Sequence, residues 1–408
     1  MASPKLRFKA FESDLISLPF EKYIESSKYG PRFDANDYDE NGNVKTIRGT
    51  DVALDATIKY EQVPKANLPI KMVEEHQLKS GDILMITTAD CGLSAVFEEQ
   101  DIPFIASAYA VRISLKNSIS PLWTKYYLQT QHIVNEVNKY VRKGTLSNLP
   151  LSDISKFTFT VPSKEEQTKI ASFLSAVDEK IAQLTQKHEL LSQYKQGMMQ
   201  KLFSQQIRFK ADDGSEFGEW INRKIIEIAE YVDYRGKTPK KVESGILLVT
   251  AKNIRFGYID YEVSREYIGA EDFDEVMRRG QAKIGDILIT TEAPLGNVAS
   301  VDRENIALAQ RVIKYRGKKD ILDNGFLKQK FLSEDFQALI ASKATGGTVQ
   351  GIKGSTLHNL EIDIPQDLNE QTKIANFLSA IDQKIEVVAQ QIEQAKQWKK
   401  GLLQQMFV

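Results

Sequence analysis

The amino-acid sequence predicts an α+β protein made of two homologous globular α/β domains, separated by two long antiparallel coiled-coil helices with pseudo-two-fold symmetry. Three observations support this fold class. A 16-residue segment occurs twice, at 166–181 and 370–385, with three mismatches. The residues before the two copies carry matching motifs in the same order. Each copy also opens a stretch whose apolar residues recur in alternating steps of four and three, the spacing of a coiled-coil seam.

The two copies, EQTKIASFLSAVDEKI and EQTKIANFLSAIDQKI, mark the starts of the long helices. Each helix is expected to continue to about Phe203 or Phe407, which makes a rod of roughly 57 Å at a rise of 1.5 Å per residue. Lys195 and Lys399 occupy matched positions in the two seams. A polar residue in a coiled-coil seam usually fixes the register, and we expect that role for His188, whose counterpart in the second seam is Ile392.

The helix starts carry a capping signal. Ser163 and Asp367 are each followed three residues later by a glutamate, Glu166 or Glu370. This spacing predicts a capping box, in which the two side chains bind backbone amides that the first helical turn leaves without partners. The domain boundaries that follow are 1–161 for the first globular domain, 162–205 for the first helix, 206–364 for the second globular domain and 365–408 for the second helix.

Motifs in the first globular domain return in the second at a nearly constant offset. Leu-Arg-Phe-Lys at 6–9 matches Ile-Arg-Phe-Lys at 207–210. The strand predicted after Gly81 has a counterpart after Gly285, 204 residues later. The other pairs are the helices predicted at 122–140 and 326–341, and Gly-Thr-Leu at 144–146 with Gly-Thr-Val at 347–349.

The order of domains and helices predicts an antiparallel pairing. The first helix ends where the second globular domain begins, and the second helix begins where that domain ends. A domain of about 150 residues has a radius of gyration near 15 Å, so its entry and exit points cannot lie a full rod length apart. A parallel pair would require that separation, whereas an antiparallel pair does not.

Composition indicates a cytoplasmic globular protein. The 408 residues carry a net charge of -1, which argues against a uniformly basic nucleic-acid-binding surface but leaves room for a local basic face. Cys91 is the single cysteine, so a disulfide framework is excluded and a reducing compartment is expected. No segment approaches the roughly 18 consecutive apolar residues of a membrane span, and the N-terminus is charged.

The sequence contains no convincing catalytic motif. Gly236-Lys237-Thr238 resembles the end of a phosphate-binding P-loop, but Tyr231 stands where the first glycine should be and Pro239 follows where a helix should start. The Pro-Pro pair of DNA amino-methyltransferases is missing, and the four histidines lack metal-ligand spacing.

Two acidic segments resemble the end of a nuclease motif. They are Asp178-Glu179-Lys180 and Asp382-Gln383-Lys384, and both lie on the predicted coiled coil, where a solvated or partner-contacting face is expected. We therefore expect a non-catalytic protein that binds no metal or cofactor itself. A free-standing nuclease or methyltransferase is one alternative, and a structural adaptor that joins proteins is another.

Loops of both globular domains combine basic, aromatic and small polar residues, a combination that suits DNA contact. Arginine and lysine neutralise phosphates or pair with guanine, asparagine reads adenine, and glycine lets backbone amides approach phosphate. The candidates in the first domain are Lys28, Tyr29, Arg32, Arg142, Lys143 and Thr145. Those in the second are Tyr234, Arg235, Lys237, Thr238, Lys252, Asn253, Arg255, Arg278, Arg279, Lys343 and Thr348.

Taken together, these features resemble the specificity subunit of type I restriction-modification systems. The resemblance rests on the segments 166–181 and 370–385, each following a proline and a diverged globular domain, and on Gly-Asp-Ile-Leu at 81–84 and 285–288. It covers essentially the whole chain. In this family the globular domains are target recognition domains, and the repeated helices are conserved regions.

The resemblance implies a function without catalysis in this chain. Each recognition domain would read one half of a bipartite, asymmetric site on double-stranded DNA, and the helix pair would set the spacing between the halves. The chain would recruit two modification subunits, which methylate adenine with S-adenosylmethionine. In the full complex it would also recruit two restriction subunits, which use ATP and Mg²⁺. Gln167, Lys169, Gln371 and Lys373 are the residues expected on the partner-facing side of the helices.

Overall fold

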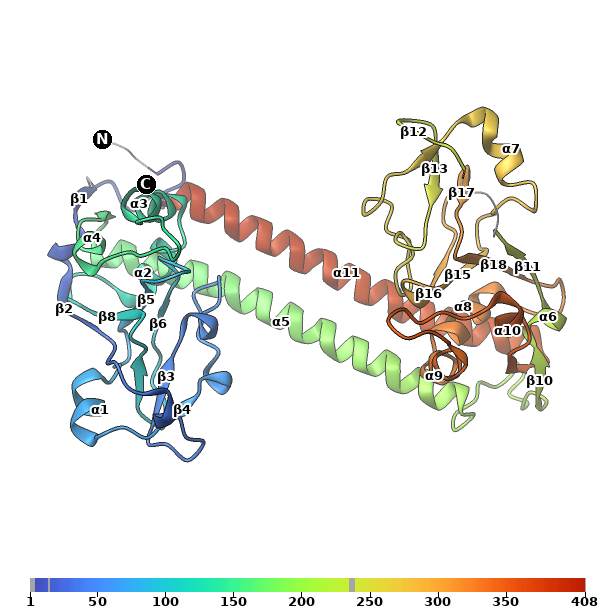
Figure 1. Ribbon diagram of the computed structural model, residues 1–408, viewed down its shortest axis with the longest axis horizontal. Helices are drawn as coiled ribbons and strands as arrows, with labels where there is room; N and C mark the ends of the chain where they lie inside the picture. Colours follow the sequence, from blue (N-terminus) through green and yellow to red (C-terminus); the bar gives the residue numbers. More distant parts are fainter. Residues whose placement is uncertain (1–3, 14, 235–238, 408) are drawn as a thin grey trace. The chain divides into compact units, whose positions relative to one another are not determined.

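The chain forms two compact units, which we call unit 1 and unit 2. The computed structural model describes residues 4–13, 15–234 and 239–407 (Figure 1). Unit 1 consists of Met1–Thr185 and Gln390–Val408, and unit 2 consists of Gln186–Ala389. Each unit therefore combines one globular region with the start of one long helix and the end of the other.

Unit 1 is built on a four-stranded antiparallel sheet in the order β2-β8-β5-β6. A smaller sheet, β4-β3-β7, contains a parallel pair, and β1 pairs with β9 next to the start of the long helix. The strands are β1 (Ile16–Pro19), β2 (Ile24–Tyr29), β3 (Val44–Ile47), β4 (Lys65–Ala66), β5 (Ile83–Ile86), β6 (Ser94–Val96), β7 (Phe104–Ala106), β8 (Ala110–Leu115) and β9 (Thr158–Val161). The short helices are η1 (Phe20–Lys22), η2 (Ala35–Asp37), η3 (Gly49–Asp51), η4 (Tyr60–Gln62), α1 (Ile70–His76), α2 (Pro121–Tyr127), α3 (Gln131–Tyr140) and α4 (Leu151–Ile154).

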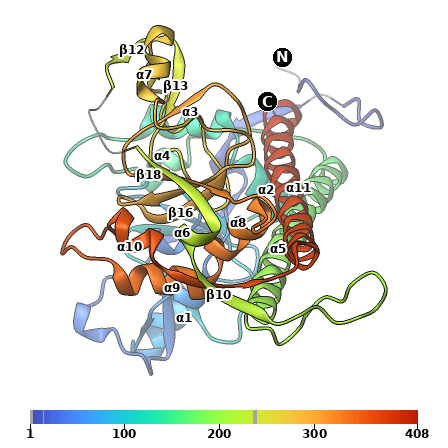
Figure 2. The same ribbon diagram turned by 90° about the vertical axis from the view of Figure 1, so that its right-hand side faces the viewer.

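Unit 2 repeats this plan. Its main sheet has the order β11-β18-β15-β16, with α8 packed against β15, β16 and β18. Figure 2 shows α8 beside β16. The second sheet, β12-β14-β13-β17, again contains a parallel pair, and β10 pairs with β19. The strands are β10 (Trp220–Lys224), β11 (Ala229–Asp233), β12 (Lys241–Val242), β13 (Ile246–Val249), β14 (Tyr267–Ile268), β15 (Ile287–Thr291), β16 (Leu295–Ser300), β17 (Ile306–Leu308), β18 (Val312–Gly317) and β19 (Glu361–Pro365). The short helices are α6 (Ile225–Ile228), η5 (Ala270–Asp272), α7 (Phe273–Val276), α8 (Asn324–Leu332), α9 (Glu334–Lys343) and α10 (Gly354–His358).

The common plan confirms that the globular regions are homologous, but one prediction about their helices is wrong. The single helices expected at 122–140 and 326–341 are each two helices, α2–α3 and α8–α9. The break has the same cause in both units. The Thr130 hydroxyl accepts from the Ile133 amide, and the Ser333 hydroxyl accepts from the Phe336 amide, so each hydroxyl caps a new helix.

The long helices α5 (Lys164–Phe203) and α11 (Leu368–Met406) are continuous, as predicted. Their antiparallel pairing is confirmed within each unit. In unit 1, Lys399 Nζ of α11 lies 2.6 Å from Asp178 Oδ1 of α5. In unit 2, Lys195 Nζ of α5 lies 2.6 Å from Asp382 Oδ1 of α11. The seam lysines thus form matched interhelical ion pairs, which accounts for two of the acidic residues that resembled a nuclease motif.

Each of these aspartates also contacts the globular part of its own unit. The Tyr126 hydroxyl donates to Asp178 Oδ2 at 2.9 Å, and Gln329 Nε2 donates to Asp382 Oδ2 at 2.9 Å. One carboxylate therefore connects three elements in each unit: α5, α11 and the helix that covers the main sheet.

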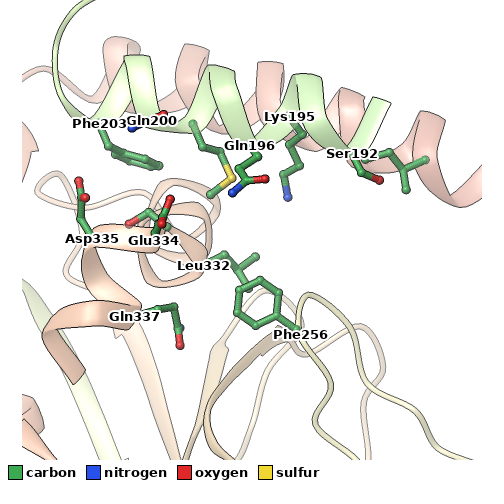
Figure 3. A pocket seen from close by; sticks show the side chains of 13 residues that line it. Ser192, Lys195, Gln196, Gln200, Phe203, Phe256, Leu332, Glu334, Asp335 and Gln337 are labelled. Carbon is green, nitrogen blue, oxygen red and sulfur yellow. The ribbon is translucent and has the colours of Figure 1, made fainter. Parts of the chain in front are cut away.

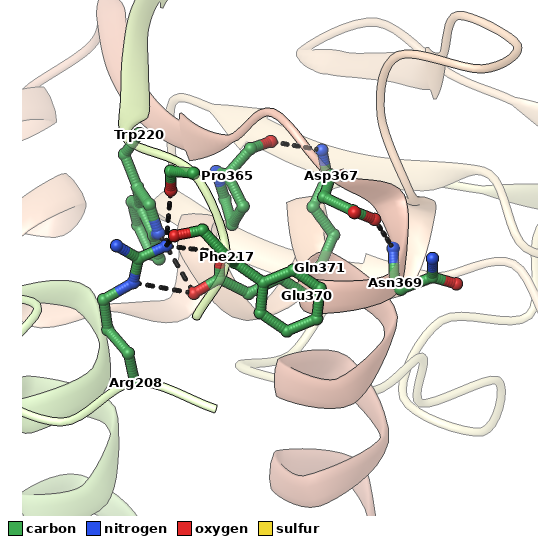
Figure 4. A network of polar contacts seen from close by, with 9 residues as sticks. Arg208, Phe217, Trp220, Pro365, Asp367, Asn369, Glu370 and Gln371 are labelled. Carbon is green, nitrogen blue, oxygen red and sulfur yellow. Dashed lines mark hydrogen bonds and ion pairs between the residues drawn. The ribbon is translucent and has the colours of Figure 1, made fainter. Parts of the chain in front are cut away.

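The glutamates at the helix starts bind arginines instead of completing capping boxes. Arg7 Nε and Nη2 donate to the Glu166 carboxylate, both at 2.7 Å. Arg208 Nε and Nη2 donate to the Glu370 carboxylate at 3.0 and 2.8 Å (Figure 4). Ser163 still accepts from the Glu166 amide at 3.3 Å, so half of the predicted box is present at that helix.

These ion pairs explain why the Arg-Phe-Lys segment is duplicated. The phenylalanine after each arginine packs edge-on against a phenylalanine of the same long helix, Phe8 on Phe173 at 5.9 Å and Phe209 on Phe377 at 5.6 Å between ring centroids. Each segment thus binds the first turns of a long helix through one ion pair and one aromatic contact.

The core of each unit is completed by the end of the helix that started in the other unit. Leu402 and Met406 of α11 and the following Phe407 belong to the core of unit 1, where the Phe407 ring centroid lies 5.8 Å from that of Trp123. Met199, Leu202 and Phe203 of α5 belong to the core of unit 2, which includes Phe326.

Candidate nucleic-acid interface

The two Gly-Thr motifs lie at the tips of equivalent surface loops, at 142–148 in unit 1 and 345–351 in unit 2. Backbone hydrogen bonds in both directions close each loop, between Arg142 and Asn148 at 2.8 and 3.0 Å, and between Thr345 and Gly351 at 2.9 and 3.0 Å. Thr145 and Thr348 are exposed at the tips. Such loops present hydroxyl and backbone amide groups to solvent in the manner that phosphate contacts require.

Equivalent hydrogen bonds attach each loop to the end of one inner strand of its main sheet, which we call the central strand. This strand is β5 in unit 1 and β15 in unit 2. In unit 1 the Leu149 amide donates to the Thr87 carbonyl at 2.8 Å, and the Thr87 amide donates to the Tyr109 carbonyl at 2.9 Å. In unit 2 the Ile352 amide donates to Thr291 at 3.0 Å, and the Thr291 amide donates to Arg311 at 2.9 Å. Three segments that are distant in sequence thus meet at one edge of each sheet.

The basic residues predicted for unit 1 surround this loop or lie on β2 and after it. Arg142 is exposed and pairs with Asp153 at 3.2 Å. Asp153 also binds Lys156, whose hydrogen bond is the main reason that the pKa of this carboxyl is lowered. Lys143 and Arg32 are exposed, and Lys28 pairs with Glu75 at 3.3 Å.

Tyr29 supports the same region structurally. Its hydroxyl accepts from the Leu151 amide at 2.8 Å, which connects β2 to the start of α4. The tyrosine therefore has a structural role whether or not its exposed ring contacts DNA.

The candidates of unit 2 are more dispersed. Lys252, Arg278, Arg279 and Lys343 are exposed. Arg278 pairs with Glu275, Arg279 donates to the Asp233 carbonyl, and the half-buried Arg255 lies 3.8 Å from Asp260. The predicted residues Arg235, Lys237 and Thr238 lie outside the described residues.

Two predicted DNA contacts in unit 2 are wrong because the side chains are buried. Asn253 accepts from the Thr250 amide and hydroxyl, and its amide group donates to the carbonyls of Asp260 and Ser264. The side chain uses its donors and acceptors to hold a loop together. Tyr234 is buried with its hydroxyl on the Gly280 carbonyl, and burial raises the pKa of this phenol.

The prediction that Gln167 and Gln371 face partners is also wrong. Both are buried against their own units, where each side chain binds three backbone groups. Gln167 accepts from the Ser120 amide and donates to two carbonyls, and Gln371 accepts from the Asp323 amide and donates likewise. Lys169 is exposed above the Phe8 ring, and Lys373 pairs with Asp212 at 2.6 Å.

Sequence reasoning missed a group of polar residues beside the Gly-Thr loop of unit 2. They line an open hollow of about 600 Å³. Arg311 and Gln310 form the turn between β17 and β18, and Glu292 follows β15. The sequence shows that these residues flank the strands shared by the two domains. It does not show that they lie beside residue 345 in the folded protein. The side chains that line the hollow include those of Thr291, Glu292, Gln310, Arg311, Thr345 and Lys353.

Each unit also carries a partly apolar groove beside the end of a long helix. In unit 2 a groove of about 550 Å³ lies between α5, the α8–α9 junction and Phe256, which is 55% exposed (Figure 3). In unit 1 a groove of about 650 Å³ is lined by Leu403 of α11, by α3 and by Leu54, which is 91% exposed.

Leu54 and Phe256 occupy equivalent places in the fold. Each lies two residues after one member of an isolated antiparallel bridge, Val52 with Ile58 in unit 1 and Ile254 with Ile259 in unit 2. The two grooves are therefore counterparts, each with a large exposed apolar side chain at its rim.

Within residues 4–13, 15–234 and 239–407, no helix has the length and apolar character to cross a membrane. The same residues contain no group of three or more His, Cys, Asp or Glu side chains arranged to hold a metal ion.

Comparison with known proteins identifies relatives along nearly the whole chain. Residues 24–193 and 218–397 match the family described as "Type I restriction modification DNA specificity domain". The chain is 28% identical over 317 residues to the type I restriction enzyme MjaVIII specificity subunit of Methanocaldococcus jannaschii, covering 73% of this chain and 72% of that protein. It is 27% identical over 306 residues to a second subunit of that organism, the putative MjaX specificity subunit, with 71% and 67% covered.

Solved structures share the fold. The crystal structure of a type I restriction-modification S subunit from M. genitalium has a TM-score of 0.60 at 16% identity, covering 100% of this chain and 99% of that one. A chain from a structure of type I restriction-modification complex assembly has a TM-score of 0.57 at 17% identity, with 96% and 97% covered.

Proposed function

The chain belongs to the family of type I restriction-modification DNA specificity proteins, and from this premise we propose that each of its two units reads one half of a bipartite DNA site. The observation that carries the proposal is the repeated framework at the sheet edge. In both units a Gly-Thr loop, the end of the central strand and a turn are joined by the same backbone hydrogen bonds.

The side chains on this framework differ between the units. Unit 1 presents Tyr109 and Arg142 where unit 2 presents Arg311 and Thr345, at corresponding places in the hydrogen-bonding pattern. Bases are distinguished by the donors and acceptors that contact their edges, so different side chains on one framework favour different sequences. The two half-sites are accordingly unlike, and the complete site is asymmetric.

The helix pair is suited to set the gap between the half-sites. α5 and α11 are continuous over 40 and 39 residues, and each has its ends in different units. A continuous helix changes length only when residues are added or removed, by 1.5 Å each. The aspartate junctions at Asp178 and Asp382 support this role, because each ties helix register to the globular part of its unit.

Two copies of a modification subunit would dock on equivalent surfaces of the two units. The partly apolar grooves at Leu54 and Phe256 support this assignment, since large exposed apolar side chains beside a hollow are typical of protein interfaces. Lys169 and Lys373 remain candidates for additional contacts. Restriction subunits would join this assembly to form the full complex.

Catalysis would reside in the partners. In this assignment the modification subunits use S-adenosylmethionine to methylate adenine, the restriction subunits use ATP and Mg²⁺, and this chain supplies double-stranded DNA recognition.

The test combines the purified full chain with the modification subunits of the same system and a random DNA library. Sequencing of the methylated molecules should give one bipartite, asymmetric site with a fixed gap. Methylation without sequence preference, or with a single continuous site, would contradict the proposal. Incubation of the chain alone with DNA is the control, and cleavage or methylation in that reaction would instead support a free-standing enzyme.

A further inference from the structure

We propose that Arg311 of unit 2 and Tyr109 of unit 1 are equivalent specificity-determining residues, with Arg311 pairing with a guanine in the half-site of unit 2. This inference rests on the proposed function and adds the residues that distinguish the two half-sites. Neither residue was among the DNA-binding candidates from sequence.

The equivalence of the two residues follows from the backbone. The carbonyl of Tyr109 accepts from both the amide and the hydroxyl of Thr87, each at 2.9 Å. The carbonyl of Arg311 accepts from the amide and the hydroxyl of Thr291, at 2.9 and 3.4 Å. Both residues immediately precede the strand that pairs with the central strand, β8 in unit 1 and β18 in unit 2.

Both side chains are exposed beside the Gly-Thr loop. Tyr109 is 65% exposed, which is high for a large aromatic residue whose backbone carbonyl binds the end of the central strand at Thr87. Arg311 lines the open hollow of unit 2 together with Thr345 at the base of the loop. A side chain at this place can reach a base edge while the loop contacts the adjoining phosphates.

The chemistry at the Arg311 position fits guanine. An arginine donates two parallel hydrogen bonds to guanine O6 and N7 in the major groove, and its planar guanidinium fits this pairing better than the flexible ammonium of a lysine. Glu292 lies 3.6 Å from Arg311 and limits the directions that the guanidinium takes. The glutamate can also accept from the amino group of a cytosine.

The backbone at Arg311 adds a second observation. Its φ is 68°, in the left-handed region that residues other than glycine seldom adopt. Such conformations persist where the surroundings enforce them, and they concentrate at binding sites. Glycine would fit this place without strain, so the backbone accepts the removal of the Arg311 side chain.

The experiment uses the full chain with its modification subunits and measures methylation across a randomised library. Arg311→Gly suits the observed φ and removes the side chain. It should reduce discrimination at one base pair of one half-site by roughly 5- to 150-fold and leave the other half-site unchanged. Arg311→Lys keeps the charge but loses the rigid pair of donors, so it should lose part of the discrimination with little change in the salt dependence of binding. Tyr109→Ala should relax only the other half-site.

Arg265→Ala is the matched control, because Arg265 is another exposed arginine of unit 2 that pairs with a glutamate, Glu262. It should leave both half-sites unchanged. Unchanged half-sites in Arg311→Gly would overturn the inference, and so would an equal loss of affinity for every sequence, which would identify a phosphate contact. If the unaltered complex selected no bipartite site, the proposed function itself would fail.

Discussion

Replacing Arg208 by methionine tests how firmly the Arg-Phe-Lys segment of unit 2 holds the start of α11. The change removes two charge-assisted hydrogen bonds to Glu370, whose side chain is 1% exposed, while that of Arg208 is 21% exposed. Removing one partner of a buried ion pair costs about 3–5 kcal/mol, because the remaining charge stays buried without compensation. The Trp220 indole still donates to Glu370 at 3.3 Å, so we expect the lower value, about 3 kcal/mol.

Amide hydrogen exchange at the first turns of α11 measures this effect. A local loss of about 3 kcal/mol corresponds to exchange that is roughly 100-fold faster there. Arg7→Met is the matched variant, since Arg7 binds Glu166 in the same way in unit 1, and it should accelerate exchange at the start of α5 instead. Adding Glu370→Gln to Arg208→Met should restore part of the protection, because no charge is then left buried.

Two results would contradict a local role of these ion pairs: equal effects of each arginine variant on both helix starts, or changes in exchange of no more than a few-fold in either variant. The first result would mean that the units respond as one, and the second that water solvates Glu370 once Arg208 is gone.

Other features of the chain lead to further expectations. Lys195→Met should lower the free energy of unfolding of unit 2 by about 1–2 kcal/mol, since Asp382 loses its ion pair. A double variant that exchanges Lys195 and Asp382 should recover much of this loss. An unaffected melting curve of Lys195→Met would show that the ion pair contributes nothing to stability. Burial raises the pKa of Tyr127 from 10.0 to about 12. The stability that the neutral phenol gives to unit 1 is therefore complete below pH 10 and is lost as the pH rises towards 12. Tyr127→Phe should flatten this decline of stability with pH in alkaline unfolding curves, and an unchanged decline would contradict the assignment. Removing one helical turn from both α5 and α11 should shorten the gap in the methylated site without changing its halves, whereas altered halves with the same gap would exclude the spacer role. Exchange of residues 14–161 with those of a relative should change a single half-site.

The long helices could be predicted from sequence because their seams repeat over about 40 residues, which exceeds the ambiguity of short patterns. The break inside the shorter helices could not. Thr130 and Ser333 cap new helices, but threonine and serine inside an apolar pattern also occur in continuous helices, where their hydroxyls bind the preceding turn.

The binding surface was predictable only in part. The Gly-Thr loops were found because both copies retained them at the same offset. The sequence does not distinguish a polar side chain that faces DNA or a partner from one that binds backbone groups in the interior. The predictions for Asn253, Gln167 and Gln371 were wrong for this reason. Arg311 was missed because the strand end and the loop that surround it lie far from it in sequence and meet only in the folded sheet.

The core of each unit contains the end of a long helix that began in the other unit, and this arrangement has a consequence for synthesis. Unit 1 contains residues up to Thr185 and then again from Gln390, so its last elements leave the ribosome about 200 residues after the rest. At 5–20 residues per second this delay is about 10–40 s. During it, Trp123 and Tyr127 lack the Phe407 ring that they contact in the finished core. Unit 2 is continuous in sequence, so the unit that is begun second is the first to be complete.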